Sequence, residues 1–458
     1  MLNKKRLRLL LLVILAVATF GLVLAACENG DANGKGEDPP TGGGEQNTPT
    51  PPTETPDLGD PTPPPADIYG DSDISHLTSL EITHMMGAGW NLGNTLDSHW
   101  NARAWGTINV PSAQEVLWGN PVTTKEMIDF VKASGFNTVR IPVTWYIFTG
   151  DGPDYEIADI WMDRVQEVVD YVIDNKMFAI LNIHHDDYIS GRGWECGWLR
   201  LYGDNAPLSD DEKAALHLRF GRLWEQIAER FKDYDEYLLF EGINEPRTIP
   251  LDGKYSKAIW EEQSLFLNDL LQTFVDTVRA SGGANAYRHL MVTPYFASVG
   301  TDAGDGDGRI RHFVDKENAT LRVDDPRGRL IVSLHYYEPW GFVTAPSDSQ
   351  WFSWYFDLDV GSVSHNLNQV RRIIDENFIS LGIPVIMGET GALHRTMPDG
   401  SSNEGERVKW VESYIGMLRD LGVPTILWDD GGQFQLLDRQ DLQWMWPDLV
   451  EAFVGLYE

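Results

Sequence analysis

From residue 71 to the end of the 458-residue chain, short apolar runs alternate with longer amphipathic stretches. Turn-forming Gly, Pro or Asn residues flank most of the apolar runs, which is typical of buried strands. The runs that predict strands are residues 86–92, 138–144, 178–184, 238–244, 290–294, 330–336, 385–389 and 425–428. The amphipathic stretches predict helices at residues 125–134, 161–175, 210–231, 260–281, 366–377 and 406–420. Thr123 and Glu126 predict a capping box at the start of the first of these helices.

This alternation predicts one (β/α)8 barrel over residues 71–458. Eight strands with intervening helices in about 390 residues fit the size range of that fold. No second linker interrupts the pattern, so we expect a single folded domain. A doubly wound open sheet is the alternative, but the first predicted strand is not followed by the glycine-rich phosphate loop of such folds.

Residues 1–27 predict a secretion signal and not a part of the fold. Basic residues precede the apolar run of residues 9–24, as they do in secretory signals. The run ends in Leu24-Ala25-Ala26-Cys27, which resembles the lipobox of bacterial lipoproteins and predicts lipidation of Cys27. An ordinary signal peptide with an incidental cysteine is the alternative. The only other cysteine is Cys196, so no intramolecular disulfide is expected if Cys27 is lipidated.

Residues 28–70 predict a disordered linker. They are mostly Gly, Pro, Thr, Asp and Glu, and they hold too few apolar side chains to offset the entropy of ordering. The Pro-rich part of this linker favours an extended chain. Together with Cys27, the linker predicts a secreted protein that is anchored to the bacterial cell envelope and meets a membrane only through its lipid.

The composition narrows the class of binding partner. A formal net charge of −33 argues against nucleic acid, whose recognition needs clustered Lys and Arg. Aromatic residues make up 11% of the chain and include 17 Trp, which is more than a core alone requires. Exposed flat rings commonly stack on a ligand. A neutral sugar polymer therefore fits this chain better than a charged partner, and we expect a monomer.

Polar side chains recur at the carboxyl ends of seven predicted strands. They are Asn91, Arg140, His184, Asn244 with Glu245, His335 with Tyr337, Glu389 and Trp428. In a barrel, these strand ends form the one face on which active sites are built. A single such residue is usually the start of a loop, but seven strands that end this way predict a site. Two of the residues are glutamates, which is the pair that glycoside hydrolysis requires.

Arg140 lies in an otherwise apolar predicted strand, where an unpaired guanidinium would be costly. We expect Glu389 to be its partner, because an adjacent cation keeps a carboxylate ionised for nucleophilic attack. A purely structural ion pair is the alternative. Glu245 would by contrast stay protonated, with a pKa raised by its surroundings and by the negative charge of Glu389.

Three further features suggest functions that the sequence does not support. Glu241 points to the same side of its predicted strand as Glu245 but lies ~13 Å deeper along it, so we expect a buried, paired and structural carboxylate.

His184 and His185 suggest a metal site, but neighbouring strand residues point to opposite faces, so no metal is expected. The acidic loop at residues 302–307 lacks the spacing and the closing glutamate of a calcium loop and predicts a solvated loop.

An ordered set of motifs resembles glycoside hydrolase family 5, and within it the subfamily 4 endoglucanases and xyloglucanases. The motifs are Gly89-Trp90-Asn91-Leu92-Gly93-Asn94-Thr95-Leu96-Asp97, Trp118-Gly119-Asn120-Pro121, residues 137–145, His184-His185, Asn244-Glu245-Pro246, His335-Tyr336-Tyr337, Gly388-Glu389 and Trp428. The resemblance implies a (β/α)8 barrel and retaining chemistry, with Glu245 as the acid/base and Glu389 as the nucleophile.

The same resemblance implies a set of substrate-binding residues and no cofactor. The set is Asn91, Arg140, His184, His185, Asn244, His335, Tyr337 and Trp428. In one place the chain departs from the pattern, because Asp430 precedes Gly431 where related sequences often have Asn. The departure leaves the two glutamates intact and puts only contacts with the bound sugar in doubt.

The expected activity is endo-acting hydrolysis of β-1,4 bonds in cellulose, xyloglucan or mixed-linkage glucan. The same fold and residues also serve mannanases and xylanases, and the sequence does not rank these backbones. A non-catalytic surface lipoprotein that captures glycans is the alternative from another class. Both glutamates and Arg140 argue against it, because binding alone needs the tryptophans and not an acid pair.

Overall fold

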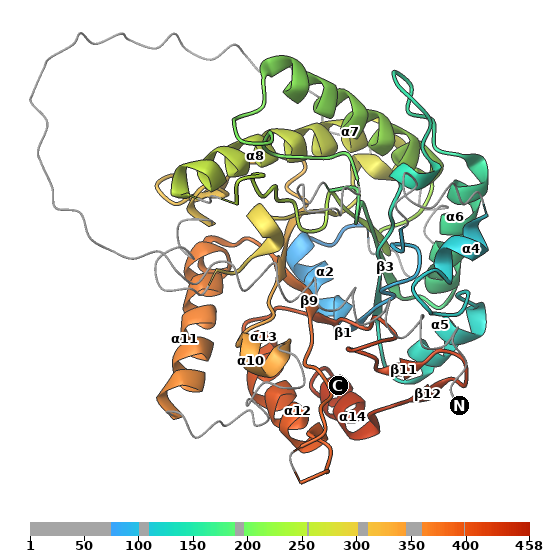
Figure 1. Ribbon diagram of the computed structural model, residues 1–458, viewed down its shortest axis with the longest axis vertical. Coiled ribbons are helices and arrows are strands. Elements are labelled where there is room, and N and C mark those ends of the chain that lie inside the picture. The colour runs from blue at the N-terminus through green and yellow to red at the C-terminus, as the bar shows by residue number, and fades with distance from the viewer. Residues whose placement is uncertain are drawn as a thin grey trace, which may run out of the picture. The chain divides into compact units, whose positions relative to one another are not determined.

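A computed structural model describes residues 75–99, 110–187, 197–253, 256–300, 310–344, 360–397 and 399–458 (Figure 1). Four features of the sequence analysis lie outside the described residues: the predicted signal with Cys27, the predicted linker, Cys196 and the acidic loop at 302–307. Within the described ranges, no helix combines the length and the hydropathy that a membrane crossing requires.

Eight parallel strands close into a barrel in the order β1-β10-β9-β8-β5-β4-β3-β2. Their bounds are β1 Ala88–Asn91, β2 Thr138–Ile141, β3 Phe178–Asn182, β4 Leu238–Glu241, β5 Leu290–Val292, β8 Leu330–His335, β9 Val385–Thr390 and β10 Thr425–Leu427. Each corresponds to one predicted run, and only β9 extends past its run, by one residue. The first strand pairs with both β2 and β10, which closes the sheet and excludes the doubly wound alternative. The (β/α)8 prediction is therefore confirmed.

Two short antiparallel hairpins, which the sequence did not predict, lie outside the barrel. One pairs β6 (Val314–Asp315) with β7 (Thr320–Leu321), and the other pairs β11 (Leu437–Asp438) with β12 (Gln443–Trp444). Each has only two residues per strand, so neither carries a periodic hydrophobic signal.

Helices surround the barrel, as Figure 1 shows. Their bounds are α2 Ser79–Met86, α4 Pro111–Glu115, α5 Lys125–Ala133, α6 Asp159–Asp174, α7 Asp210–Arg230, α8 Lys257–Ala280, α10 Trp340–Val343, α11 Val360–Asn377, α12 Glu404–Trp410, α13 Gly416–Asp420 and α14 Pro447–Gly455. The helix predicted at 406–420 is interrupted, because a π-helical turn, η7 (Val411–Ile415), separates α12 from α13. The predicted capping residue of α5 is also wrong. Thr124 caps this helix by accepting from the backbone N–H of Met127 at 3.3 Å.

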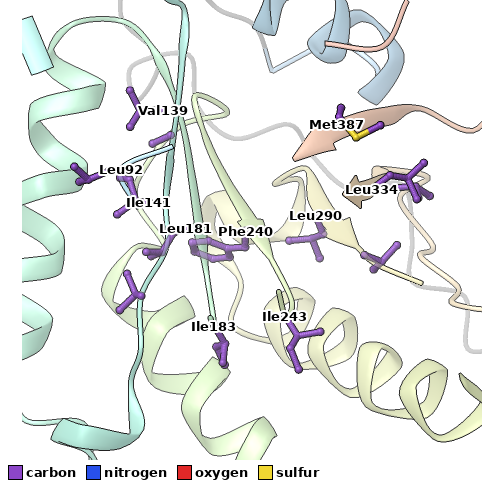
Figure 2. Close-up of a cluster of buried hydrophobic side chains, with 14 of the residues drawn as sticks. Leu92, Val139, Ile141, Leu181, Ile183, Phe240, Ile243, Leu290, Leu334 and Met387 are labelled. Atoms are coloured by element: carbon purple, nitrogen blue, oxygen red, sulfur yellow. The ribbon is translucent and has the colours of Figure 1, made fainter. Parts of the chain in front are cut away.

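Successive side chains along each strand point alternately towards the surrounding helices and towards the barrel interior. Residues such as Val139, Leu181 and Phe240 point towards the surrounding helices and are fully buried there (Figure 2). Each buried side chain of this size stabilises the fold by roughly 1.5–3 kcal/mol. Their strand neighbours, including Arg140, face the barrel interior instead.

The amino ends of the strands are closed by α2. Ile82 and Met86 of this helix pack in a second apolar cluster with inward-facing strand residues near those ends, such as Ile180 and Leu239. Thr78 and Glu81 form a capping box that begins the helix. Apolar side chains thus fill the base of the barrel interior, and the charged side chains Arg140, Glu241 and Glu389 lie towards the carboxyl ends of the strands.

Candidate active site

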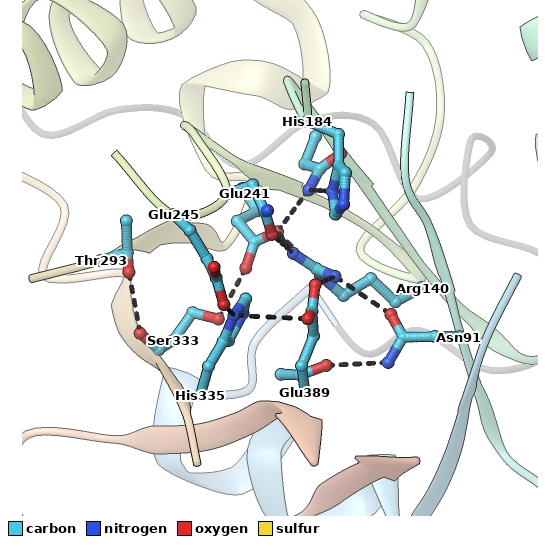
Figure 3. A network of polar contacts seen from close by, with 12 residues as sticks. Asn91, Arg140, His184, Glu241, Glu245, Thr293, Ser333, His335 and Glu389 are labelled. Carbon is cyan, nitrogen blue, oxygen red and sulfur yellow. Dashed lines mark hydrogen bonds and ion pairs between the residues drawn. The ribbon is translucent and has the colours of Figure 1, made fainter. Parts of the chain in front are cut away.

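The carboxyl ends of the strands bring the predicted polar residues together (Figure 3). Asn91, Glu241 and His335 are the last residues of β1, β4 and β8, while Arg140 and Glu389 lie within the last two residues of β2 and β9. The other predicted residues lie in the loops that follow the strands: His184, His185, Asn244, Glu245, Tyr337 and Trp428.

Arg140 is the centre of this arrangement and is fully buried. Its Nη1 donates to Glu389 Oε1 at 2.6 Å, so the predicted pair is present. The same Nη1 donates to Asn91 Oδ1 at 3.0 Å, and Nη2 donates to Asn244 Oδ1 at 2.7 Å. The Asn91 amide in turn donates to the backbone carbonyl of Gly388 at 2.9 Å, next to Glu389. The guanidinium is thus held on several sides and cannot rotate away from the carboxylate.

Glu241 is a second carboxylate on the same guanidinium. It accepts from Arg140 Nε at 2.8 Å, and its Oε2 lies 2.6 Å from Arg140 Nη2. Asn182 Nδ2 and Ser333 Oγ donate to its two oxygens at 2.8 and 2.6 Å. Glu241 is therefore buried and paired as predicted. It also shares its cation with Glu389, which the sequence did not predict.

The two predicted catalytic carboxylates face each other across His335. Nδ1 of His335 lies 2.8 Å from Glu245 Oε1 and 3.6 Å from Glu389 Oε2. One oxygen of Glu245 and one of Glu389 lie within 4.8 Å of each other. The hydroxyl of Tyr337 donates to Glu389 Oε2 at 3.2 Å. Glu389 therefore accepts hydrogen bonds from two side chains, whereas Glu245 is held by His335.

The pKa directions of the pair are the opposite of the prediction. Burial raises the pKa of Glu245, but the hydrogen bond and charge of His335 and the charges of Arg247 and Arg140 bring it below its ordinary value. Burial and the charge of Glu245 raise the pKa of Glu389, although His335 and Arg140 oppose them. Burial also disfavours the charged form of His335, yet the two carboxylates raise its pKa. For Glu245 the prediction failed because it did not include the imidazole of His335, and for Glu389 it failed because burial outweighs the charge of Arg140.

His184 and His185 are closer together than the predicted strand allowed. β3 ends at Asn182, so the two histidines follow the strand, and their ring centroids are 4.4 Å apart. Together with Asp97 they offer ligand atoms within 4.8 Å of one another. The geometric reason given for expecting no metal is therefore wrong.

The hydrogen bonds of Asn182 nevertheless argue against a metal on His184. The backbone N–H of Val143 donates to Asn182 Oδ1, so the amide group of Asn182 must point its hydrogens the other way. Those hydrogens reach Glu241 and, at 3.1 Å, His184 Nδ1. Burial lowers the pKa of His184, which is then neutral with its proton on Nε2. His184 thus offers an N–H donor, which suits a sugar hydroxyl better than a cation.

Trp428 is half-buried and lies parallel to the His184 ring, with centroids 5.9 Å apart and planes 3° apart. Gly93 makes room for it, because a Cβ at Gly93 would lie 2.8 Å from the indole ring. Asp430, the one departure from the expected pattern, accepts from the backbone N–H groups of Gly432 and Phe434 at 2.7 and 2.9 Å. It stabilises the turn that follows Trp428.

Residues 98–433 match the family model for cellulase, glycosyl hydrolase family 5. The chain belongs to this family. Endoglucanase B of Neocallimastix patriciarum is 36% identical over 84% of this chain and 73% of its own length. The xyloglucan-specific endo-β-1,4-glucanase of Bacteroides ovatus is 34% identical over 79% of this chain and 67% of its own length.

Solved structures of family members are similar to this chain in sequence and in fold. A GH5-4 broad-specificity endoglucanase from Ruminococcus champanellensis with bound cellotriose is 37% identical, covers 82% of this chain and 98% of its own, and has a TM-score of 0.67. A lichenase from Caldicellulosiruptor sp. F32 in complex with cellotetraose is 31% identical, covers 83% and 96%, and has a TM-score of 0.68. The family and the likeness to subfamily 4 that the motifs predicted are confirmed.

Proposed function

We propose that the chain is a retaining endo-β-1,4-glucanase, with Glu389 as nucleophile and Glu245 as acid/base. The observation that carries this proposal is the separation of the two carboxylates, whose nearest described oxygens lie within 4.8 Å of each other. Retaining enzymes keep the pair ~5–5.5 Å apart, whereas inverting enzymes need ~6.5–9.5 Å to admit a water. The catalytic water therefore enters only after the first bond is broken.

In the first step, a Glu389 oxygen attacks the anomeric carbon while the bond to the leaving oxygen breaks. Glu245 gives its proton to that oxygen, and a glycosyl ester forms on Glu389. In the second step, water loses a proton to Glu245 and attacks the anomeric carbon. The ester bond then breaks, the sugar leaves with retained configuration, and both carboxyl groups return to their starting state.

Glu389 suits the role of nucleophile because its two hydrogen-bond donors do not transfer protons at working pH. Arg140 donates to one of its oxygens and Tyr337 to the other. Burial and the charges of the two glutamates raise the pKa of Tyr337 well above its usual range, so its hydroxyl remains a donor. As the ester forms, Glu389 loses its negative charge, and its hydrogen bonds from Arg140 and Tyr337 weaken.

Glu245 and His335 act together as the source of the catalytic proton. The 2.8 Å bond between them can hold its proton on either atom, and the two arrangements carry the same total charge. The raised pKa of His335 keeps that proton available above the range of an isolated carboxylic acid. When the leaving oxygen gains negative charge, the proton passes through Glu245 to it.

The choice of β-1,4-glucan as substrate rests on the relatives. Their names describe endoglucanases, a xyloglucan-specific endoglucanase and a lichenase, and solved relatives carry cellotriose or cellotetraose. Trp428 offers a ring for the sugar at the cleavage point, and His184 offers an N–H donor beside it. A mannanase or xylanase would use the same carboxylates, so a panel of glucan, xyloglucan, mannan and xylan substrates, measured by reducing ends, tests the choice.

A covalent trap tests the roles of the two glutamates. A 2-deoxy-2-fluoro cellobioside with an activated leaving group should leave an ester on the peptide that contains Glu389. Glu245→Ala should be rescued by azide as a β-glycosyl azide, and Glu389→Ala as the α-azide, since the anion then enters from the vacated face. A label on Glu245, or a first product of inverted configuration, would contradict the assignment. A glycan-capturing protein without catalysis would give neither label nor product.

In this proposal the enzyme is also a lipoprotein of the bacterial cell envelope. The support is the sequence Leu24-Ala25-Ala26-Cys27 and the polar linker that follows it. An anchored endo-enzyme would cut chains outside the membrane and release oligosaccharides next to the cell.

A further inference from the structure

The chain turns sharply after β5 in a conformation that L-residues avoid. Phe296 and Ala297, both in the 3-10 turn η5 (Tyr295–Ala297), have φ angles of 59° and 48°. A non-glycine residue is disfavoured in this left-handed region, because its Cβ lies too close to the following carbonyl oxygen. Two in succession persist only where surrounding contacts hold them, and such strain clusters at functional sites. We call residues 295–298 the β5 turn.

The β5 turn touches both sides of the Glu245–His335 pair. On one side, the backbone N–H of Phe296 donates to the carbonyl of Pro246 at 3.1 Å, directly after Glu245. On the other side, Ser298 forms an isolated parallel bridge with His335, the last residue of β8. The turn thus connects the loop of the acid/base to the strand that presents its hydrogen-bond partner.

The same turn supports a cation beside Glu245. The guanidinium of Arg247 lies over the Phe296 ring, 3.7 Å from its centroid. A cation at this distance is attracted by the negative face of the aromatic ring. The charge of Arg247 acts on Glu245 and on the buried carboxylate of Asp187. Arg247 is therefore placed by Phe296 where its charge reaches the acid/base.

We propose that the β5 turn and Arg247 form a positioning element for the acid/base, which fixes the contact between Glu245 and His335. This inference rests on the proposed function, because it assumes that Glu245 delivers the proton. Arg247 and Phe296 act through Glu245, and neither has a role in the attack by Glu389.

Proton transfer from Glu245 depends on where its carboxyl group is held. General acid catalysis contributes typically 10²–10⁴-fold to a rate, and a displacement of about 1 Å can remove a large part of it. His335 lies 2.8 Å from Glu245 but 3.6 Å from Glu389, so a small shift of either loop would change which carboxylate it holds. The strained backbone of the β5 turn prevents that shift, because one side of the turn is bonded to Pro246, the residue after Glu245, and the other side is paired with His335.

Leaving-group dependence separates placement of the acid from general damage. Departure of a sugar alcohol needs protonation, whereas departure of 2,4-dinitrophenolate does not. We expect Phe296→Ala and Arg247→Ala to lower kcat/KM on cellotetraose about 10-fold and on 2,4-dinitrophenyl β-cellobioside by less than about twofold. Phe296→Tyr keeps the ring and should restore the wild-type ratio of the two activities.

Two comparisons make the test decisive. Arg327→Ala removes a guanidinium that lies 5.3 Å over Tyr287 at the other end of the barrel, and it should leave the ratio unchanged. Glu245→Ala must itself show strong leaving-group dependence; if it does not, the acid role in the proposed function is wrong. If it does, an equal loss on both substrates in Phe296→Ala and Arg247→Ala, or no loss, overturns the positioning role. Arg247 is half-exposed, so its variant decides the matter if Phe296→Ala does not fold.

Discussion

Replacing Glu241 by glutamine should show how the charge of Glu241 affects Glu389, the other carboxylate that is paired with Arg140. The glutamine carbonyl can face Arg140 and Asn182, the donors that Glu241 Oε2 accepts from at 2.8 Å. The amide nitrogen would face Ser333, whose hydroxyl can rotate to accept instead of donate. The hydrogen bonds are then kept, and the variant chiefly removes one negative charge from a fully buried site.

The expected loss of stability follows from the buried ion pair. Removing one partner of such a pair costs about 3–5 kcal/mol when the other is left without compensation. Here Glu389 still faces Arg140, and the amide still accepts from it, so we expect about 3 kcal/mol in the free energy of unfolding for Glu241→Gln. Glu241→Ala, which also leaves Asn182 and Ser333 without their acceptor, should cost more.

The activity should change in its pH dependence. With Glu241 neutral, the charge of Arg140 is balanced by fewer anions and stabilises ionised Glu389 more strongly. The pKa of Glu389, which burial raises in the native protein, should fall. Because the nucleophile must be ionised, kcat/KM is lost as the pH drops through this pKa. The acidic limb of the profile should therefore move to lower pH.

The measurement is a urea unfolding curve together with a kcat/KM profile across the acidic limb. Glu115→Gln is the matched control, because Glu115 is fully buried and bonds Arg164 Nε at 2.8 Å between α4 and α6. It should lower stability without moving the limb. An acidic limb that stays in place or moves to higher pH in a folded Glu241→Gln would refute the sharing of Arg140.

Three further outcomes are expected. His335→Asn should lower kcat/KM and shift the basic limb of its pH profile downwards, because the raised pKa of His335 keeps the proton available as the pH rises; an unchanged basic limb would exclude His335 as its source. Trp428→Ala should lose about 1–3 kcal/mol of transition-state stabilisation, measured as kcat/KM on cellotetraose, if a sugar stacks as a base does; a wild-type value would leave the ring a packing role. Cys27→Ser should lose metabolic lipid label and leave the membrane fraction, whereas an unchanged distribution would contradict the anchor.

The strands were predictable because their signal is local. Apolar runs bounded by turn residues identify a buried parallel strand without knowledge of its neighbours, and all eight were found. Once eight strands form a barrel, the position of a residue at the carboxyl end of its strand places it on the active face. The meeting of Arg140 and Glu389 followed from this rule, although 249 residues separate them in the chain.

The features that the sequence missed depend on contacts between loops or on the sharing of one group by several others. The positive φ angles of the β5 turn were not predictable, because they belong to Phe296 and Ala297 and not to glycines. Asn182 lies in a predicted strand with the parity of His184, but nothing in its neighbourhood says that it orients the imidazole. The π-helical turn η7 lies inside an uninterrupted amphipathic pattern, so the pattern predicted one helix.

The roles of the carboxylates show why a pairwise reading of charges fails at this site. Three glutamates, at 241, 245 and 389, share two groups that can carry positive charge, Arg140 and His335. A sequence suggests that each carboxylate needs a partner, but it does not say how the partners are divided. In the structure, Glu241 takes two nitrogens of Arg140, Glu389 takes one, and Glu245 takes His335. The only partner able to transfer a proton near neutral pH therefore belongs to Glu245, which is the physical reason for assigning the acid to Glu245 and the nucleophile to Glu389.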